Sequence, residues 1–304
     1  MREHRLLQGN CLAVLQTLGP ESVNCCVTSP PYWGLRDYGV KGQLGLEPSP
    51  DKYVEKLVAI FAELKRVLKK DGTLWLNLGD SYQTNSTGNT GQSVHKRELR
   101  SKPAIGTRTV WNGLPSKNLV GIPWRVAFAL QAAGWRLRQD IIWNKPNPMP
   151  ESVRDRPTRA HEYIFLLSKS EKYYYDYKAI REDKAYWGAR GDFRPKVNSA
   201  RNDNKSLAAY NGNEDDARNK RSVWTINTQA YPDAHFATFP EDLIKPCILA
   251  GCPEDGWVID PFAGSGTTLV VAKFLGRNAI GIELNPEYIK LAKKRLDTQQ
   301  HALF

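Results

Sequence analysis

The sequence lacks any long apolar run: no stretch approaches the roughly 18 consecutive apolar residues that a membrane-spanning helix needs. The segment after Met1 also lacks the apolar centre of a signal peptide. Because 41% of the 304 residues are hydrophobic, the chain can still bury one large core. We therefore expect a protein that makes no membrane contact and resides in the cytoplasm.

Cysteine is scarce, and its spacing argues against two kinds of structural site. The five cysteines form no C-x-x-C pair with matched histidines, so we expect neither disulfides nor structural zinc. Cys25 and Cys26 lie within an apolar run, which favours two small buried side chains over a nucleophile. The sequence therefore predicts no metal site.

The glycine-rich run DPFAGSGTT, Asp260 to Thr268, is the most informative segment. It joins a predicted buried strand, residues 256–260, to a predicted helix, residues 267–276, so backbone donors would meet a ligand at this turn. Glu283 ends the next predicted strand, where an acid can accept hydrogen bonds from ribose hydroxyls. Because the third glycine of G-x-G-x-x-G is absent, a phosphate-free nucleoside is favoured over pyrophosphate. The alternative is a turn with a purely structural role.

A second informative segment is T-S-P-P-Y-W, residues 28–33, which follows the apolar run Val23 to Val27. It therefore lies just past the carboxyl end of a predicted strand, where open sheets bind ligands. Two consecutive prolines remove two N–H donors and leave the Ser29 hydroxyl and the Pro30 carbonyl as acceptors beside aromatic side chains. Two acceptors beside an aromatic ring suit the binding of an exocyclic amino group.

Together these motifs resemble the S-adenosylmethionine-dependent DNA amino-methyltransferases, which methylate cytosine N4 or adenine N6. The catalytic motif precedes the cofactor motif, as in the permuted beta class of that family. The resemblance implies catalytic roles for Ser29, Pro30, Pro31 and Tyr32. It implies that S-adenosylmethionine is held by the glycine run, the later acid and an F-P pair, namely Asp260, Pro261, Phe262, Gly264, Ser265, Gly266, Thr267, Thr268, Glu283, Phe239 and Pro240.

Further elements resemble the same family. Residues 235–243, beginning with His235, are similar to the family element that lines the methionine end of the cofactor, and residues 142–168 to the element that borders the target-base pocket. We accordingly expect Trp33, Lys145 and His161 at that pocket, with core packing as the alternative for Trp33 and surface exposure for the other two. One departure is Asn10, where the family often has Asp after the first strand.

The net charge of +11 is concentrated in two weakly patterned segments. Residues 81–118 carry six lysines and arginines against one acid, and residues 178–222 carry eleven against seven. Such segments gain affinity for DNA phosphates through counterion release, although solvated basic loops are the alternative. We expect a catalytic half at residues 1–171 with a basic loop at 81–118, a target-recognition insert at 172–224, and a cofactor half at 225–304.

Helical and strand patterns alternate along the chain, which predicts an α/β fold with a mostly parallel sheet. The resemblance implies a circularly permuted, Rossmann-like class I methyltransferase fold, with seven strands, helices on both faces and a small insert. Strands are predicted at residues 4–8, 23–27, 73–78, 138–143, 162–167, 256–260 and 278–284. Helices are predicted at residues 11–18, 51–69, 123–133, 267–276 and 286–296. Rejoining the chain ends places Trp257–Asp260 beside Val23–Val27.

The resemblance implies a site-specific methyltransferase that acts on the N4 amine of a cytosine flipped out of double-stranded DNA. Ser29 favours cytosine, because family members with Ser-Pro-Pro-Tyr-Trp tend to methylate cytosine. The alternatives are adenine N6, a catalytically inactive DNA-binding module, and methylation of RNA or a protein amide. We expect a bacterial, archaeal or phage-encoded protein, either monomer or homodimer, with a cognate restriction endonuclease as a partner that it does not physically bind.

Overall fold

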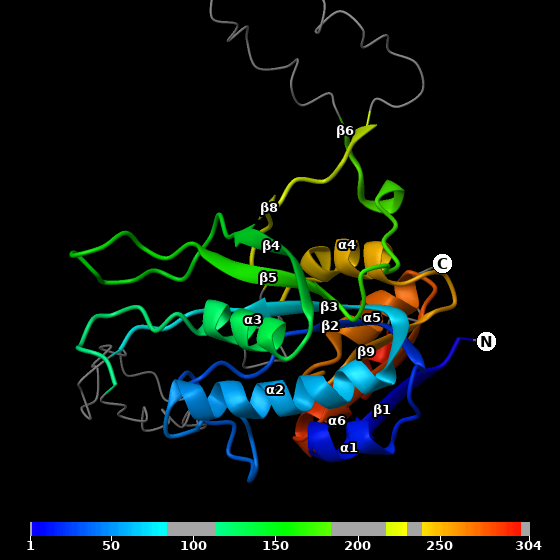
Figure 1. Cartoon of the computed structure of the whole chain (residues 1–304), viewed down its shortest axis with the longest axis horizontal. Coiled ribbons are helices and arrows are strands. Elements are labelled where there is room, and N and C mark those ends of the chain that lie inside the picture. Colours follow the sequence, from blue (N-terminus) through cyan, green and yellow to red (C-terminus); the bar gives the residue numbers. More distant parts are fainter. Residues whose placement is uncertain (1, 84–112, 184–216, 230–238, 299–304) are drawn as a thin grey trace, which may run out of the picture.

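The computed structural model describes residues 2–83, 113–183, 217–229 and 239–298. Its centre is a sheet of eight strands in the order β1-β10-β9-β2-β3-β5-β4-β8 (Figure 1). Only β5 runs antiparallel to its neighbours. The strands are β1 (His4–Gln8), β2 (Val23–Thr28), β3 (Leu68–Leu78), β4 (Arg136–Asn144), β5 (His161–Ser168), β8 (Val223–Thr225), β9 (Trp257–Asp260) and β10 (Asn278–Glu283).

The two halves of the chain meet at the centre of this sheet. Strand β9 pairs in parallel with β2, with Val258 opposite Cys25 and Ile259 opposite Cys26. Strand β1 pairs with β10, so the first strand follows the last one in space. The pairing of β9 with β2 was expected from rejoining the chain ends and is confirmed. On one side of the β2–β9 junction the sheet continues through β10 and β1, and on the other through β3, so a topological switch point lies there.

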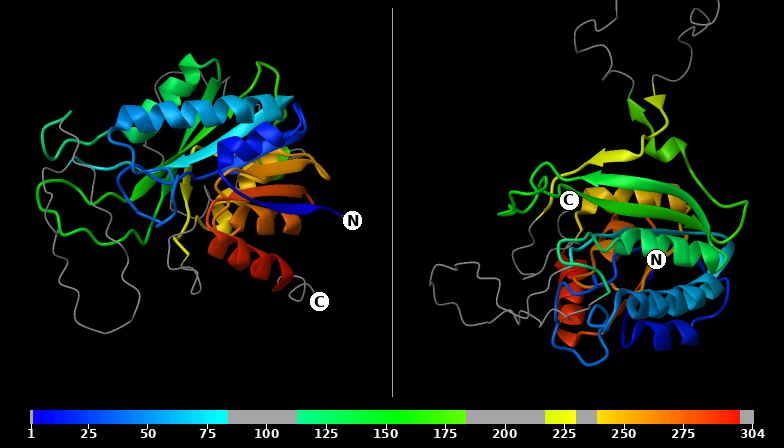
Figure 2. Two further views of the ribbon diagram at one scale, coloured as in Figure 1. Left: turned by 90° about the horizontal axis from the view of Figure 1, so that it is seen from below. Right: turned by 60° about the vertical axis from the view of Figure 1, so that its left-hand side comes forward.

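Helices cover both faces of the sheet (Figure 2). On one face lie α1 (Cys11–Thr17), α2 (Pro50–Val67) and α3 (Ile122–Ala132), and on the other lie α4 (Glu241–Gly251), α5 (Thr267–Phe274) and α6 (Pro286–Thr298). Along β3, Leu74 and Leu76 belong to the core beneath α1, α2 and α3, and Trp75 belongs to the core on the opposite face of the sheet. This alternation follows from the two-residue period of a strand and explains why β2 and β3 are buried on both sides.

Two differences from the predicted elements have local causes. The sheet has eight strands rather than seven, because β8 extends it beside β4 and buries Trp224. Helix α4 was not predicted, because Pro246 lies inside it and proline usually ends a helix. Its buried face, which includes Leu243 and Ile248, packs against the sheet and offsets that penalty.

The remaining described elements form a small arm next to the sheet. They are the 3-10 helix η1 (Lys178–Ile180) and the antiparallel pair β6 (Glu182–Asp183) and β7 (Ala217–Arg218). The larger part of the expected target-recognition insert and of the basic loop lies outside the described residues. Among the described residues, no helix is long and apolar enough to span a membrane.

Candidate active site

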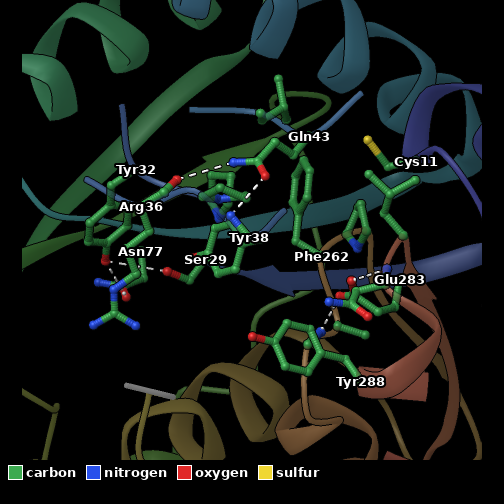
Figure 3. A pocket seen from close by; sticks show the side chains of 18 of the residues that line it. Cys11, Ser29, Tyr32, Arg36, Tyr38, Gln43, Asn77, Phe262, Glu283 and Tyr288 are labelled. Atoms are coloured by element: carbon green, nitrogen blue, oxygen red, sulfur yellow. Dashed lines mark hydrogen bonds between the residues drawn. The ribbon is translucent and has the colours of Figure 1, made fainter. Parts of the chain in front are cut away.

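A pocket of about 640 Å³ opens at the carboxyl ends of β2, β9 and β10 (Figure 3). It is lined by Ser29, Pro30, Pro31 and Tyr32 from the loop after β2, and by Pro261, Phe262, Gly264 and Ser265 from the loop after β9. Residues more than 200 positions apart in the chain therefore face one cavity. The Pro-Pro turn after β2 and the glycine turn after β9 therefore open into one cavity.

Asp260 joins the two loops from beneath the pocket. Its carboxylate accepts hydrogen bonds of 2.6 Å from the Thr28 hydroxyl and 2.6 Å from the Thr268 hydroxyl. Asp260 is 1% exposed and does not line the cavity, and neither does Thr268. Burial raises the pKa of Asp260 to about 6, although the threonine hydroxyls oppose the shift. Both residues were expected to contact the cofactor. Their positions instead fix one loop relative to the other.

The glycine turn has a conformation that only glycine adopts readily. Gly264 has φ +51° and Gly266 has φ +81°, both in the left-handed region. A Cβ on Gly266 would lie 2.8 Å from the Cβ of Ala292 on α6. Gly264 lines the pocket, whereas Gly266 faces α6 and does not. Gly266 therefore allows the turn to pack closely against the last helix.

Arg295 supports the turn from behind, a role that the sequence did not reveal. This buried side chain donates to the Ser265 carbonyl at 3.1 Å, the Ser265 hydroxyl at 2.9 Å and the Thr267 hydroxyl at 2.9 Å. It also pairs with Glu241 at 3.1 Å. Ser265 and Thr267 line the pocket, but their hydroxyl oxygens already accept hydrogen bonds from α6.

Glu283 stands at the end of β10 beside the glycine turn. Its two carboxylate oxygens accept hydrogen bonds from the backbone N–H of Gly264 at 2.8 Å and of Asn285 at 2.7 Å. Burial raises its pKa, and these amides oppose the shift. An ionised carboxylate has about four acceptor positions, so capacity remains for a hydroxyl group of a ligand.

Aromatic side chains surround the same end of the pocket. Phe262, Tyr38 and Tyr288 line it, and the two tyrosine rings meet edge to face with centroids 6.5 Å apart. Figure 3 shows Phe262 and Tyr288 beside Glu283, with Tyr38 between them and Ser29. A carboxylate for a ribose and aromatic faces for a flat ring fit a nucleoside, and the glycine turn supplies close backbone approach.

The opposite end of the pocket holds a chain of polar groups. The Ser29 hydroxyl donates to the Tyr32 hydroxyl at 3.3 Å, and Tyr32 donates to the Glu162 carboxylate at 2.7 Å. Asn77 donates to the same carboxylate at 3.1 Å, and Lys145 pairs with its other oxygen. Burial raises the pKa of Tyr32 well above its usual value, and the neighbouring Glu162 charge raises it further. The tyrosine is therefore a neutral donor.

Packing fixes Tyr32 from two further directions. A Cβ on Gly79 would lie 2.6 Å from Cε2 of the Tyr32 ring, so the ring packs directly against this glycine. A Cβ on Gly45 would lie 2.8 Å from the Tyr32 carbonyl oxygen. The preceding Pro31 carbonyl accepts a hydrogen bond of 2.8 Å from the buried Tyr53 of α2. The Pro-Pro turn is thus anchored to the core.

The structure places some expected pocket residues inside the cavity and others outside it. Lys145 and Phe239 line it, whereas Trp33, His161 and Pro240 do not. Trp33 is 5% exposed, belongs to the core beside α2 and donates to the Glu47 carbonyl at 2.9 Å. The alternative of core packing was right for this residue.

The other two residues that do not line the pocket, His161 and Pro240, have structural roles nearby. The His161 ring stands edge to face with Tyr163 at 5.4 Å, and Pro240 begins α4 as its N-cap. His235 and the three residues after it lie outside the described residues. Asn10, the departure from the family pattern, lines the pocket and caps α1 through hydrogen bonds from the N–H groups of Leu12 and Ala13.

Several lining residues were missed because only the fold brings them together. Asn77 and Glu162 lie on adjacent antiparallel strands, 85 positions apart in the chain. The sequence contains a partial indication of Asn77, because this polar residue interrupts the otherwise apolar run Leu74–Leu78. The aromatic pair of Tyr38 and Tyr288 joins a loop and α6 and had no comparable signal.

Comparison with known proteins places this chain among DNA methylases by sequence. A family model described as DNA methylase, for the N6 and N4 enzymes, matches residues 23–294. The Type II methyltransferase M.Cfr9I of Citrobacter freundii is 49% identical, over 96% of this chain and 87% of the relative. The Type II methyltransferase M.SmaI of Serratia marcescens is 48% identical, over 97% of this chain and 91% of the relative.

Solved structures have the same fold at lower identity. The cytosine-N4-specific PvuII DNA methyltransferase aligns with a TM-score of 0.64 and 20% identity, covering 96% of this chain and 86% of the other. TTHA0409, a DNA modification methylase of Thermus thermophilus described as putative and solved with S-adenosyl-L-methionine, aligns with a TM-score of 0.61 and 23% identity, covering 99% and 97%.

Proposed function

Because the chain belongs to the N4 and N6 DNA methylase family and is a Type II DNA amino-methyltransferase, we propose that it methylates the N4 amine of cytosine in duplex DNA. The observation that carries the proposal is the single pocket shared by the Pro-Pro turn and the glycine turn. Ser29 favours cytosine over adenine, as argued from the motif, and a solved methyltransferase of the same fold has that specificity in its name.

S-adenosylmethionine, the cofactor of this family, fits the end of the pocket that holds Glu283. We assign the ribose hydroxyls to the Glu283 carboxylate and the adenine to the faces of Phe262, Tyr38 and Tyr288. Gly264 gives the close backbone approach, and Asp260, Gly266 and Thr268 hold the turn in place from below. When bound, this cofactor provides an electrophilic methyl group on a sulfonium.

The target amine fits the other end, against Ser29 and Pro30. An exocyclic amine is a weak nucleophile, because its lone pair is delocalised into the ring. Two acceptors that bind both N–H groups favour a more tetrahedral nitrogen and direct the lone pair toward the methyl group. Alignment of the two partners contributes most to such a transfer, and no covalent enzyme intermediate is needed. Pro31 and Tyr32 hold the acceptors in position through Tyr53 and Glu162.

The base must leave the double helix to reach this pocket. Extrusion costs a few kcal/mol, which stacking and hydrogen bonds in the pocket offset. We assign DNA phosphate contacts to the basic segments at residues 81–118 and 178–222, and target recognition to the insert at 172–224, between a catalytic half, 1–171, and a cofactor half, 225–304. Since the matched relatives are Type II methyltransferases, we propose that a restriction endonuclease with the same site accompanies this protein.

Nucleoside analysis of methylated DNA tests the proposal. Unmodified genomic DNA is incubated with the protein and methyl-labelled S-adenosylmethionine, digested to nucleosides and examined by mass spectrometry. We expect labelled N4-methylcytosine. Label only in N6-methyladenine would assign the other amine of the family, and cofactor binding without any labelled nucleoside would favour a DNA-binding module that has lost turnover.

A further inference from the structure

We propose that Glu162 is a positioning residue that sets the direction of a hydrogen-bond chain and thereby makes Ser29 an acceptor toward the target amine. The proposal rests on the function proposed above and concerns how the same pocket distinguishes an amine from a carbonyl. The chain runs from Ser29 through Tyr32 to Glu162, and Figure 3 shows its first members meeting at the Tyr32 hydroxyl.

Glu162 is the fixed end of this chain. Its side chain is 14% exposed and is paired with the ammonium of Lys145, which is 17% exposed and lies 4.1 Å over the Trp143 ring. An ionised carboxylate accepts hydrogen bonds and donates none, and an ammonium only donates. All three side chains that contact Glu162 in this cluster, Lys145, Asn77 and Tyr32, accordingly act as donors.

Tyr32 has one hydroxyl proton, and three acceptors of the described residues lie within reach, one of them the Ser29 hydroxyl oxygen at 3.3 Å. The Glu162 oxygen is 2.7 Å away, and the Asn77 carbonyl oxygen is 3.2 Å away. The shortest bond is also the one to a charged acceptor, and such bonds are roughly twice as strong as neutral ones. The Tyr32 proton therefore points to Glu162, and the lone pairs of the Tyr32 oxygen face elsewhere.

The direction of the hydrogen bond between Ser29 and Tyr32 follows from the direction of the one between Tyr32 and Glu162. Because the Tyr32 proton is committed to Glu162, the contact of 3.3 Å between the two hydroxyls requires Ser29 to donate. The Ser29 oxygen then keeps its lone pairs for the pocket and has no proton left for a ligand. An amine can donate to it without losing its own lone pair, whereas a carbonyl oxygen in the same place would meet an acceptor.

Replacing Glu162 by glutamine would remove this constraint with little change of shape. A glutamine amide can donate to Tyr32, and the tyrosine proton is then free to point at Ser29, at 3.3 Å, or at the Asn77 carbonyl oxygen, at 3.2 Å. Tyr32→Phe breaks the chain at its centre and frees the Ser29 proton directly. Both variants are expected to let Ser29 donate, and both therefore should weaken the preference for an amine.

The test measures equilibrium binding rather than turnover. After the methylated position has been mapped, two duplexes are compared in the presence of S-adenosylhomocysteine. One holds the normal target base, and the other holds its carbonyl analogue, uracil for cytosine or hypoxanthine for adenine. The ratio of the two dissociation constants in each variant is divided by the wild-type ratio, so differences in duplex stability cancel. Glu171→Gln, at an exposed acid away from the pocket, is the control.

We expect Glu162→Gln and Tyr32→Phe to reduce the preference for the amine roughly tenfold relative to wild type, and Glu171→Gln to leave it unchanged. A folded Glu162→Gln variant with the wild-type ratio overturns the proposal. If that variant does not fold, Tyr32→Phe decides in the same way. A failure of the proposed function can be told apart from a failure of this proposal. If the wild-type protein labels N6-methyladenine, the proposed target base is wrong, but the comparison of adenine with hypoxanthine still tests the role of Glu162.

Discussion

The raised pKa of Asp260 predicts a pH dependence of stability that one substitution should remove. Burial raises this pKa to about 6 from an ordinary value of 3.8, so the folded protein binds the proton more tightly than the unfolded chain does. The contribution of Asp260 to stability is therefore fully present below about pH 4 and is lost as the pH rises to about 6. The difference between the two pKa values corresponds to about 3 kcal/mol.

Asp260→Asn keeps the shape of the side chain and cannot ionise. We expect the free energy of unfolding of wild type, measured relative to this variant, to fall by about 2 kcal/mol between pH 4 and pH 6.5 and then to level off. Urea unfolding followed by tryptophan fluorescence at a series of pH values measures it. Asp242→Asn, at an exposed acid on α4, is the matched control. A difference between wild type and Asp260→Asn that does not change with pH would refute the reasoning.

Two further predictions concern the cofactor end of the pocket. Glu283→Gln should weaken S-adenosylmethionine binding roughly 10- to 100-fold in calorimetry, because one backbone N–H loses its acceptor and the ribose loses a charged one; unchanged affinity would remove Glu283 from the cofactor site. Gly266→Ala should destabilise the fold by about 2 to 3 kcal/mol in urea unfolding, through its φ of +81° and its contact with Ala292. Gly264→Ala, with no atom nearer than 4.0 Å, should show only the smaller backbone penalty, and equal losses would contradict the role given to Ala292.

Much of the fold was predictable because its signals are local. Apolar runs such as Val23–Val27 and helical patterns such as residues 123–133 predicted the strands and helices with small errors at their ends. Strand β3, for example, begins at Leu68, where the sequence had suggested that the preceding helix continued to Lys69. Helix α4 was missed because its stability depends on burial against the sheet, which overrides the local effect of Pro246.

The site was predictable where one motif carries it and unpredictable where distant residues complete it. The Pro-Pro turn and the glycine turn line one pocket as expected. The direction in which a side chain points was not visible, so Trp33 was placed at the pocket although it packs in the core. Asp260 likewise points beneath the pocket, toward two threonines. Arg295 and Glu162 act through partners far away in the sequence, and no local pattern indicates such pairs.

The most direct test of the account is Ser29→Ala, with methyl transfer and cofactor binding measured on the same preparation. The account holds that Ser29 positions the amine at one end of a pocket whose other end binds the cofactor. It predicts an unchanged dissociation constant for S-adenosylmethionine and a single-turnover rate of methyl transfer to DNA that falls roughly 100-fold or more. A variant that transfers methyl groups at the wild-type rate would contradict the account.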